Sequence, residues 1–204
     1  MALGNADSPL DERLVQVALG LLETEGLGAL TLRRIARRAG VSHGAPQRHF
    51  DSLSELLAEV AARGFALLSE ALEKSGASLP PDVGPLERLR AAGRAYVATA
   101  VANPALFALM FRPEDLDLGN AAFLRESSAA FEQVVRHVRA AQVGGWHASR
   151  DTRLLAGCVW SAVHGLASLW AGGAFSGPVP AASLDDALTT LEMVLGTSQG
   201  ELDE

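Results

Sequence analysis

TLRRIARRAGVSHGAPQRHF, residues 31–50, is the stretch that decides the fold of this chain. It holds five arginines and no acidic residue, in a protein whose formal net charge is −7. Thr31 can cap a helix whose apolar positions recur at helical spacing, and Gly40 can adopt the positive φ of a tight turn. Ser42 can then cap a second short helix that ends near residues 49–50. Two short helices around a glycine turn, with local positive charge, are typical of a helix-turn-helix DNA-binding motif.

The distribution of charge along the chain agrees with this interpretation. Residues 1–50 carry six arginines and five acidic residues, whereas residues 51–204 carry eleven basic and nineteen acidic residues. DNA repels an acidic protein, so a protein of this kind can approach DNA only with its basic face. Charge alone is equally consistent with an ordinary helix that has a solvated basic face. Its coincidence with the glycine turn is what favours DNA binding.

The run from residue 14 to residue 57 resembles the N-terminal domain of tetracycline-repressor-type (TetR family) transcriptional regulators. That family shows the pattern T-x-x-x-I-A-x-x-A-G-V-S-x-G followed by Y-x-H-F, and the resemblance covers about residues 8–68. The matching residues are Thr31, Ile35, Ala36, Ala39, Gly40, Val41, Ser42, Gly44, His49 and Phe50. The chain departs from the family at Gln47, where a tyrosine is usual, and at Leu53, where a lysine is usual. Both usual residues tend to contact phosphates, so weakened DNA binding is an open alternative.

We expect the DNA contacts to come from this segment, with a double-stranded, palindromic operator as the partner. Contacts to phosphates are expected from Thr31, Arg33 and Arg34, and Gly44 allows the backbone to approach the DNA closely. The remaining expected contacts, to base edges or flanking phosphates, come from Ser42, His43, Ala45, Gln47, Arg48 and His49.

The rest of the chain is predicted to be helical, so the fold class is all-α with about nine helices. Helical periodicity is nearly continuous, and no alternating β-branched run of useful length occurs. Besides the helix-turn-helix pair, the expected helices cover residues 10–25, 52–75, 85–102, 104–111, 120–143, 150–174 and 183–195. We expect a DNA-binding domain at residues 8–68 and a ligand-binding and dimerisation domain at residues 80–200.

Residues 154–184 contain no Asp, Glu, Lys or Arg, which indicates a helix buried on most sides. One face of this helix carries only small residues, so another helix can approach it closely. The last helix presents a leucine seam that must also be buried. Together the two helices suggest a symmetric homodimer through a four-helix bundle, in agreement with the family; a hairpin buried within one chain is the alternative. The expected interface residues are Gly157, Ser161, Gly165, Ser168, Gly172, Leu184, Leu188, Leu191 and Leu195.

Two further motifs, Trp160-x-x-x-His164-Gly165 and the segment NPALFALMF at residues 103–111, resemble the "WHG" C-terminal domain of some members of the family. The resemblance implies a pocket for a small, mostly apolar effector. The expected ligand-binding residues are Tyr96, Phe107, Met110, Phe111, Phe131, Trp160 and His164, with Phe65, Leu68 and Phe123 as further candidates. Aromatic residues at helical spacing are more often simply core, and His164 can equally be a core histidine.

Other function classes find little support in the sequence. Cys158 and His164 lie about 120° apart on one helix and cannot form a nucleophile–base pair locally, so no enzyme is expected. The five histidines show no metal-ligand spacing, and neither a metal nor a cofactor is expected. One cysteine and no evident signal peptide suit a cytoplasmic protein without a disulfide framework. Three hypotheses remain: a repressor released from DNA by a small molecule, a ligand- or protein-binding module that has lost DNA binding, and a membrane-associated protein motivated by the uncharged stretch.

Overall fold

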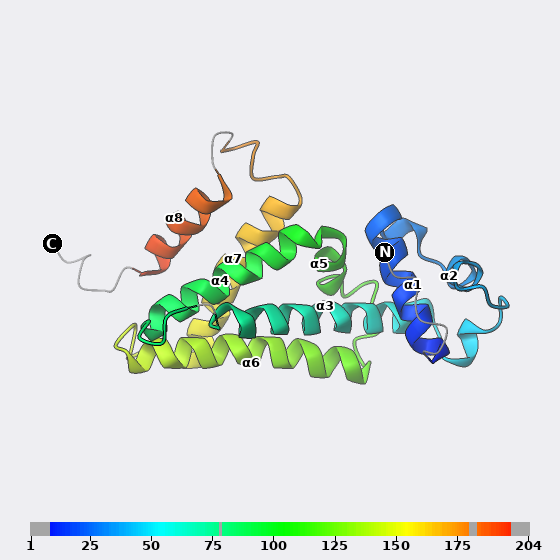
Figure 1. Cartoon of the computed structure of the whole chain (residues 1–204), viewed down its shortest axis with the longest axis horizontal. Helices are drawn as coiled ribbons and strands as arrows, with labels where there is room; N and C mark the ends of the chain where they lie inside the picture. The colour runs from blue at the N-terminus through cyan, green and yellow to red at the C-terminus, as the bar shows by residue number, and fades with distance from the viewer. Residues whose placement is uncertain (1–8, 78, 180–182, 197–204) are drawn as a thin grey trace. The chain divides into compact units, whose positions relative to one another are not determined.

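The computed structural model describes residues 9–77, 79–179 and 183–196. Within these ranges the chain forms eight α-helices and two 3₁₀ turns and contains no strand (Figure 1), which confirms the all-α prediction. The α-helices are α1 (Leu10–Glu25), α2 (Leu32–Ala39), α3 (Leu53–Ser75), α4 (Pro85–Ala102), α5 (Pro104–Met110), α6 (Ala121–Val143), α7 (Thr152–Ala171) and α8 (Leu184–Gly196). The 3₁₀ turns are η1 (Leu27–Ala29) and η2 (Pro46–Arg48).

The helices group into two compact units. The first contains the described residues up to Ala66 together with Asn103–Ser128, and the second contains Leu67–Ala102 and the described residues from Ala129 onward. Helices α3 and α6 therefore contribute residues to both units. The expected domains at residues 8–68 and 80–200 stay a prediction, since residues 103–128 group here with the first unit. Residues 8, 180–182 and 197–200 of those two ranges lie outside the described residues.

Local capping interactions set the ends of α2 as the sequence predicts. The Thr31 side chain accepts a hydrogen bond of 3.1 Å from the backbone N–H of Arg34, which satisfies a free donor of the first turn. Gly40 follows the helix with φ of 73°, and the N–H of Val41 donates to the carbonyl of Ala36 at 3.0 Å. This positive φ is the conformation that closes a helix with a glycine.

The expected second short helix of the helix-turn-helix motif takes the form of a 3₁₀ helix, η2 (Pro46–Arg48), in this structure. Only one 3₁₀ turn, η2, forms between Ser42 and Phe50. The reason is Pro46, which has no N–H and cannot donate to the carbonyl four residues earlier. The segment makes shorter-range bonds instead, such as Ala45 N–H to Ser42 O at 3.0 Å. The Pro46 ring is fully buried, so the same residue that interrupts the helix anchors the turn in the core.

The core of the first unit is built on one face of α1. Leu14, Ala18 and Leu22, spaced by four residues, are at most 1% exposed, and Ile35 of α2 and Leu56 of α3 are fully buried as well. Each leucine or isoleucine buried in this way stabilises the unit by about 1.5–3 kcal/mol. Phe65 adds an aromatic cluster, with ring centroids 5.4 Å from Phe111 and 5.7 Å from Phe123.

In the second unit, α4 and α7 form the main helix pair. Val97 and Ala100 of α4 are fully buried, as are Ala156 and Ala167 of α7. Small residues let the two helices approach closely. Helix α8 packs against α7 and closes the unit on one side (Figure 1).

Candidate DNA-binding surface and ligand cavity

The residues expected to contact DNA divide into an exposed group and a partly buried group. Ala45 and Arg34 are half-buried. The exposed members are Thr31, Arg33, Ser42, His43, Gly44, Gln47, Arg48 and His49. The core residues of the same stretch, Ile35, Ala36, Pro46 and Phe50, point inward and hold this surface in place.

Arg34 already has partners within the chain. Its side chain forms an ion pair with Glu25, the last residue of α1, and its backbone N–H is held by Thr31. Arg13 of α1 also supports this region, because its Nη2 donates to the carbonyl of Ala39 at 3.0 Å, at the end of α2. Arg34 and Arg13 thus fix α2 against α1, which leaves Arg33 as the exposed guanidinium near the start of α2.

Arg37 and Arg38 belong to the same basic surface, although the contacts expected from the sequence did not include them. Both are exposed in the last turn of α2. Arg33 and Arg37 are four residues apart, so their like charges share one helix face and destabilise an isolated helix. Since residues 26–50 contain no acid, a polyanion would relieve this repulsion. The i, i+4 spacing in the sequence was the signal that could have identified Arg37.

The start of α3 carries acidic instead of basic groups. The N–H of Glu55 donates to Ser52 Oγ at 3.1 Å, and the Glu55 carboxylate accepts from the N–H of Asp51 at 2.6 Å. Leu53, where the family has a lysine, is half-buried. This helix start is therefore well capped, but it offers no cation to a phosphate.

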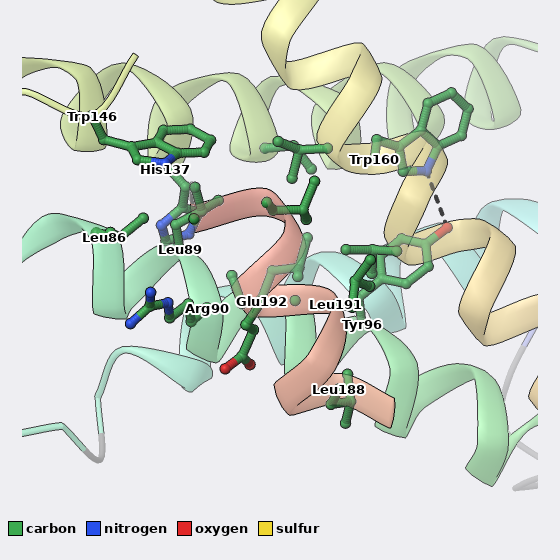
Figure 2. Close-up of a pocket in the computed structure, with 18 residues that line it drawn as sticks. Leu86, Leu89, Arg90, Tyr96, His137, Trp146, Trp160, Leu188, Leu191 and Glu192 are labelled. Atoms are coloured by element: carbon green, nitrogen blue, oxygen red, sulfur yellow. Dashed lines mark hydrogen bonds between the residues drawn. The ribbon is translucent and has the colours of Figure 1, made fainter. Parts of the chain in front are cut away.

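The second unit contains a cavity with about 740 Å³ of empty space, counting the part that opens to solvent. Its wall is mostly apolar and comes from α3, α4, α6, the segment after α6, α7 and α8 (Figure 2). The lining residues are Leu72, Leu86, Leu89, Arg90, Ala92, Gly93, Tyr96, Val134, His137, Trp146, Val159, Trp160, Val163, Leu188, Leu191, Glu192, Leu195 and Gly196.

The residues expected to bind a ligand do not all lie together. Tyr96 and Trp160 line the cavity. Phe131 packs against Trp160, with ring centroids 5.8 Å apart, and His164 is hydrogen-bonded to Tyr96, so these two lie behind the lining. Phe107, Met110 and Phe111 are part of the first unit, together with Phe65 and Phe123. Aromatic residue type predicted burial but not the unit in which each residue is buried.

Tyr96 is the centre of a hydrogen-bond network. The Trp160 indole can only donate, so its Nε1–H donates to Tyr96 Oη at 3.1 Å, and the same hydroxyl shares a hydrogen bond of 2.9 Å with His164 Nδ1. His164 Nε2 lies 3.2 Å from Ser168 Oγ. Burial raises the pKa of the Tyr96 hydroxyl, and the Trp160 bond lowers it by less; burial also lowers the pKa of His164. A neutral tyrosine and a neutral histidine therefore join α4 to α7.

The expected dimer residues also divide between two environments. Leu188, Leu191 and Leu195 of α8 line the cavity, and Leu184 is half-buried. The small-residue stripe of α7 is open: Ser161, Ser168 and Gly172 are exposed, and a Cβ added at Gly157 or Gly165 would meet no atom within 4 Å. The free Cys158 and Leu154, 70% exposed, extend the same open face.

Arg94 holds α8 over the cavity, and the sequence pattern did not identify it. Its Nη1 donates to Asp185 at 2.6 Å, and its Nη2 donates to Glu192 at 3.0 Å and to Thr189 at 3.3 Å. The bond to Glu192 is the main cause of a raised Arg94 pKa. Residues about 95 positions apart form this cluster, so no local pattern could reveal it.

The structure gives little support to a metal site or to a membrane-spanning helix. No group of three or more potential metal ligands occurs in the part of the chain that the structure describes. Helix α7 is long and apolar enough to cross a membrane by length and composition, but one such helix is weak evidence. A helix of a water-soluble protein that packs on one side and meets a partner on the other passes the same test.

Comparisons with known proteins cover both units. Residues 14–60 match the model of bacterial regulatory proteins of the tetR family, and residues 89–191 match the model of the tetracyclin repressor-like C-terminal domain. No curated protein matches the sequence.

Solved structures similar to this chain extend the match to nearly its whole length. A protein of unknown function from Rhodococcus sp. RHA1 is 30% identical, with a TM-score of 0.79 over 95% of this chain and 97% of that chain. The TetR family transcriptional regulator PfmR from Thermus thermophilus is 20% identical, with a TM-score of 0.65 over 90% and 97% of the two chains. The fatty acid degradation regulator FadR from Bacillus halodurans is 13% identical, with a TM-score of 0.69 over 96% and 99%. The likeness to PfmR and FadR concerns the fold alone.

Proposed function

The chain belongs to the TetR family of bacterial transcriptional regulators, and we propose that it is a cytoplasmic repressor whose DNA affinity is set by a small molecule. The family makes it a DNA-binding transcriptional regulator. The observation that carries the proposal further is the combination of an acid-free, exposed arginine surface in the first unit with an apolar cavity in the second. The arginine surface binds the phosphate backbone of DNA, and the cavity binds the effector.

Three exposed groups are assigned to the DNA. Arg33 and Arg48 bind phosphates or base edges, and Thr31 Oγ1, which already accepts from Arg34, donates its hydroxyl proton to a phosphate. A dimer presents two such surfaces to a palindromic operator, one in each of two successive major grooves.

The route between ligand and DNA is assigned to α3. This helix supplies buried residues to the first unit, among them Leu56, and supplies Leu72 to the cavity wall of the second. A ligand that displaces Leu72 therefore moves the same helix that the DNA-binding unit is packed on. Coupling of this kind usually amounts to about 1–3 kcal/mol, or 5- to 150-fold in operator affinity.

DNA binding is tested on the region upstream of the chain's own gene, over a range of salt concentrations. We expect a specific complex whose affinity falls steeply with salt. Arg33→Ala and Arg48→Ala should each weaken it and lower the salt slope by about 0.9 for each phosphate that the variant no longer neutralises. Arg139→Ala is the matched control, because Arg139 is exposed on α6 and has the same charge. Equal effects from all three variants would refute the assigned surface.

The second candidate function is a ligand- or protein-binding module that no longer binds DNA. Three features favour it: Gln47, Leu53 and the shortness of the second motif helix, which is the 3₁₀ helix η2. The double variant Gln47→Tyr/Leu53→Lys restores the family's usual residues and separates the two functions. If the double variant binds the upstream DNA at low salt and the wild type forms no specific complex there, the module is correct and the repressor is not.

A further inference from the structure

The two ends of the cavity differ in polarity. At one end, Tyr96 and Trp160 satisfy each other through the bond of 3.1 Å. Arg90, His137 and Trp146 gather at the other end, as Figure 2 shows. Leu86 and Leu89 of α4 also lie at the Arg90 end, and Leu188 and Leu191 of α8 lie toward Tyr96 (Figure 2); Leu89 and Leu188 are both 8% exposed.

Trp146 carries a buried donor that has no acceptor in the described part of the chain. The residue is only 7% exposed, its Nε1 is buried, and no hydrogen-bond partner lies within reach of that atom. Leaving a buried N–H unsatisfied costs about 1–3 kcal/mol. An atom of this kind on a cavity wall is satisfied when an acceptor enters the cavity.

The Trp146 backbone is held rigidly, so its indole is already in position for a ligand. The Trp146 backbone N–H donates to the carbonyl of Ala141 at 3.1 Å. The N–H of Gly145, which has a φ of 98°, donates to the carbonyl of Gln142 at 2.9 Å, and these two bonds cap the C-terminal end of α6. The Gln142 side chain then ties the next loop by donating to the carbonyl of Arg150 at 2.8 Å. A donor that is fixed beforehand loses little entropy on binding.

Arg88 supplies positive charge near this end of the cavity, because its charge acts on His137 in the cavity wall. Arg88 donates to four backbone carbonyls, those of Gly76, Pro80, Pro81 and Val83, which hold its guanidinium without neutralising it. Arg90 lines the cavity and is paired with Glu87 on its exposed side at 3.2 Å. The carboxylate of Glu192, farther along the wall, is neutralised by Arg94.

His137 does not oppose this positive field. Burial is the main cause of its lowered pKa, followed by the charges of Arg136 and Arg88. The imidazole is therefore neutral and can donate one N–H or accept one bond.

We propose that the effector is an elongated apolar monocarboxylate, with its carboxylate bound by Trp146 Nε1–H at the Arg90 end and its apolar chain running toward Tyr96 and Trp160. An acceptor oxygen satisfies the indole, and a negative charge is favoured over a neutral carbonyl because Arg88 and Arg90 lie at that end. Hydrogen bonds to charged groups are about twice as strong as neutral ones. This inference rests on the proposed use of the cavity as the effector site.

The test measures binding to the full-length protein without DNA, by calorimetry, for decanoate and for methyl decanoate. We expect decanoate to bind wild type at least tenfold more tightly than the ester. Trp146→Phe keeps the aromatic ring and removes the N–H, and should weaken decanoate about tenfold and the ester much less. Trp170→Phe is the matched control, because Trp170 is half-buried against Phe175 and does not line the cavity.

A second readout is made on the wild-type protein and uses the Trp146→Phe variant only to assign one resonance. The chain has three tryptophans, so three indole N–H resonances are expected in a nitrogen-15 spectrum. The resonance that disappears in Trp146→Phe should shift downfield when decanoate is added to wild type, and should shift less with the ester. Equal affinity of acid and ester, or an unmoved Trp146 resonance at saturation, overturns the inference.

The two proposals fail separately. If the protein binds the DNA upstream of its own gene but does not bind decanoate, the proposal of a monocarboxylate effector is wrong and the proposed regulator function is supported. If decanoate binds through Trp146 but no DNA complex forms, the proposed class of effector is supported and the proposed repressor function is refuted.

Discussion

Gly64 leaves no room for a side chain between α3 and α5. A Cβ built at this position would lie 2.6 Å from Met110 Sδ, 2.8 Å from Met110 Cγ and 3.1 Å from Leu106 Cγ. Both neighbours are buried, so neither can move into solvent. The glycine is thus a packing requirement in the middle of a helix where alanine would otherwise be preferred.

We therefore predict that Gly64→Ala destabilises the protein by up to about 2 kcal/mol, because overpacking of about 1–3 kcal/mol is offset by a gain in helix propensity of only about 1 kcal/mol. Gly20→Ala is the matched control, since its Cβ meets nothing within 4 Å inside α1, and it should stabilise by up to about 1 kcal/mol. Urea unfolding of both variants measures the difference. A Gly64→Ala protein as stable as Gly20→Ala would mean that α5 does not pack here.

The buried histidines predict how stability depends on pH. The pKa of His137 is lowered by burial and by Arg136 and Arg88, and that of His164 is lowered by burial. As the pH falls below about 6.5, the unfolded chain takes up these protons while the folded chain does not. The free energy of unfolding should therefore decrease between about pH 7.5 and about pH 5.5, and His137→Gln should make the decrease smaller. The urea midpoint at several pH values tests this, and a decrease of the same size in His137→Gln and wild type would contradict it.

Helices α4 and α7 are joined by polar groups as well as by packing. The Tyr96 hydroxyl accepts a hydrogen bond from Trp160 and shares another with His164, so one oxygen links two side chains on the facing helix. The motif Trp160-x-x-x-His164 therefore joins α7 to α4, because side chains four positions apart lie on the same face of α7 and bond to the same tyrosine.

Removing that oxygen should loosen the helix pair. We predict that Tyr96→Phe lowers the free energy of unfolding by about 1–3 kcal/mol, because the Trp160 N–H loses this acceptor and His164 loses this hydrogen bond. The double variant Tyr96→Phe/Trp160→Phe provides the control, because the cost of Tyr96→Phe should shrink once the indole is already gone. Strictly additive costs would show that the two side chains are not coupled.

The helices themselves could be predicted from the sequence because their end signals are local. Thr31 with Arg34 and Ser52 with Glu55 are neighbours in the chain, and each pair forms a capping hydrogen bond in the structure. The second motif helix is short for an equally local reason, because Pro46 lies in the middle of it and has no N–H to donate.

The site could be predicted less well because its residues are distant in sequence. The leucine seam of α8 indicated burial, but a pattern of spacing does not say which surface covers it, and Leu188 and Leu191 face the cavity of their own unit. Arg94 and Trp146 gain their roles from α8 and from the end of α6. Tertiary contacts of this kind leave no periodic signal.

At the scale of the whole molecule, the open stripe of α7 is the surface we propose for a second copy of the chain. Among the described residues, Cβ atoms added at Gly157 and Gly165 would meet no atom within 4 Å, and a two-fold axis would bring the stripe against itself. The proposed repression of a palindromic operator would depend on this interface, because one chain alone reaches only one half-site.

We predict that Ser161→Arg converts a dimer into a monomer and weakens operator binding at least 100-fold. The substitution places a charge on each side of a symmetric interface, where burial without a partner costs several kcal/mol. Ser128→Arg is the matched control on an exposed site of α6. Sedimentation velocity gives the oligomeric state, circular dichroism checks that the helices remain, and titration of a half-site separates a defect in dimerisation from a defect in DNA recognition. A Ser161→Arg protein that stays dimeric would move the interface off this face of α7, toward the outer face of α8 where Met193 is 61% exposed.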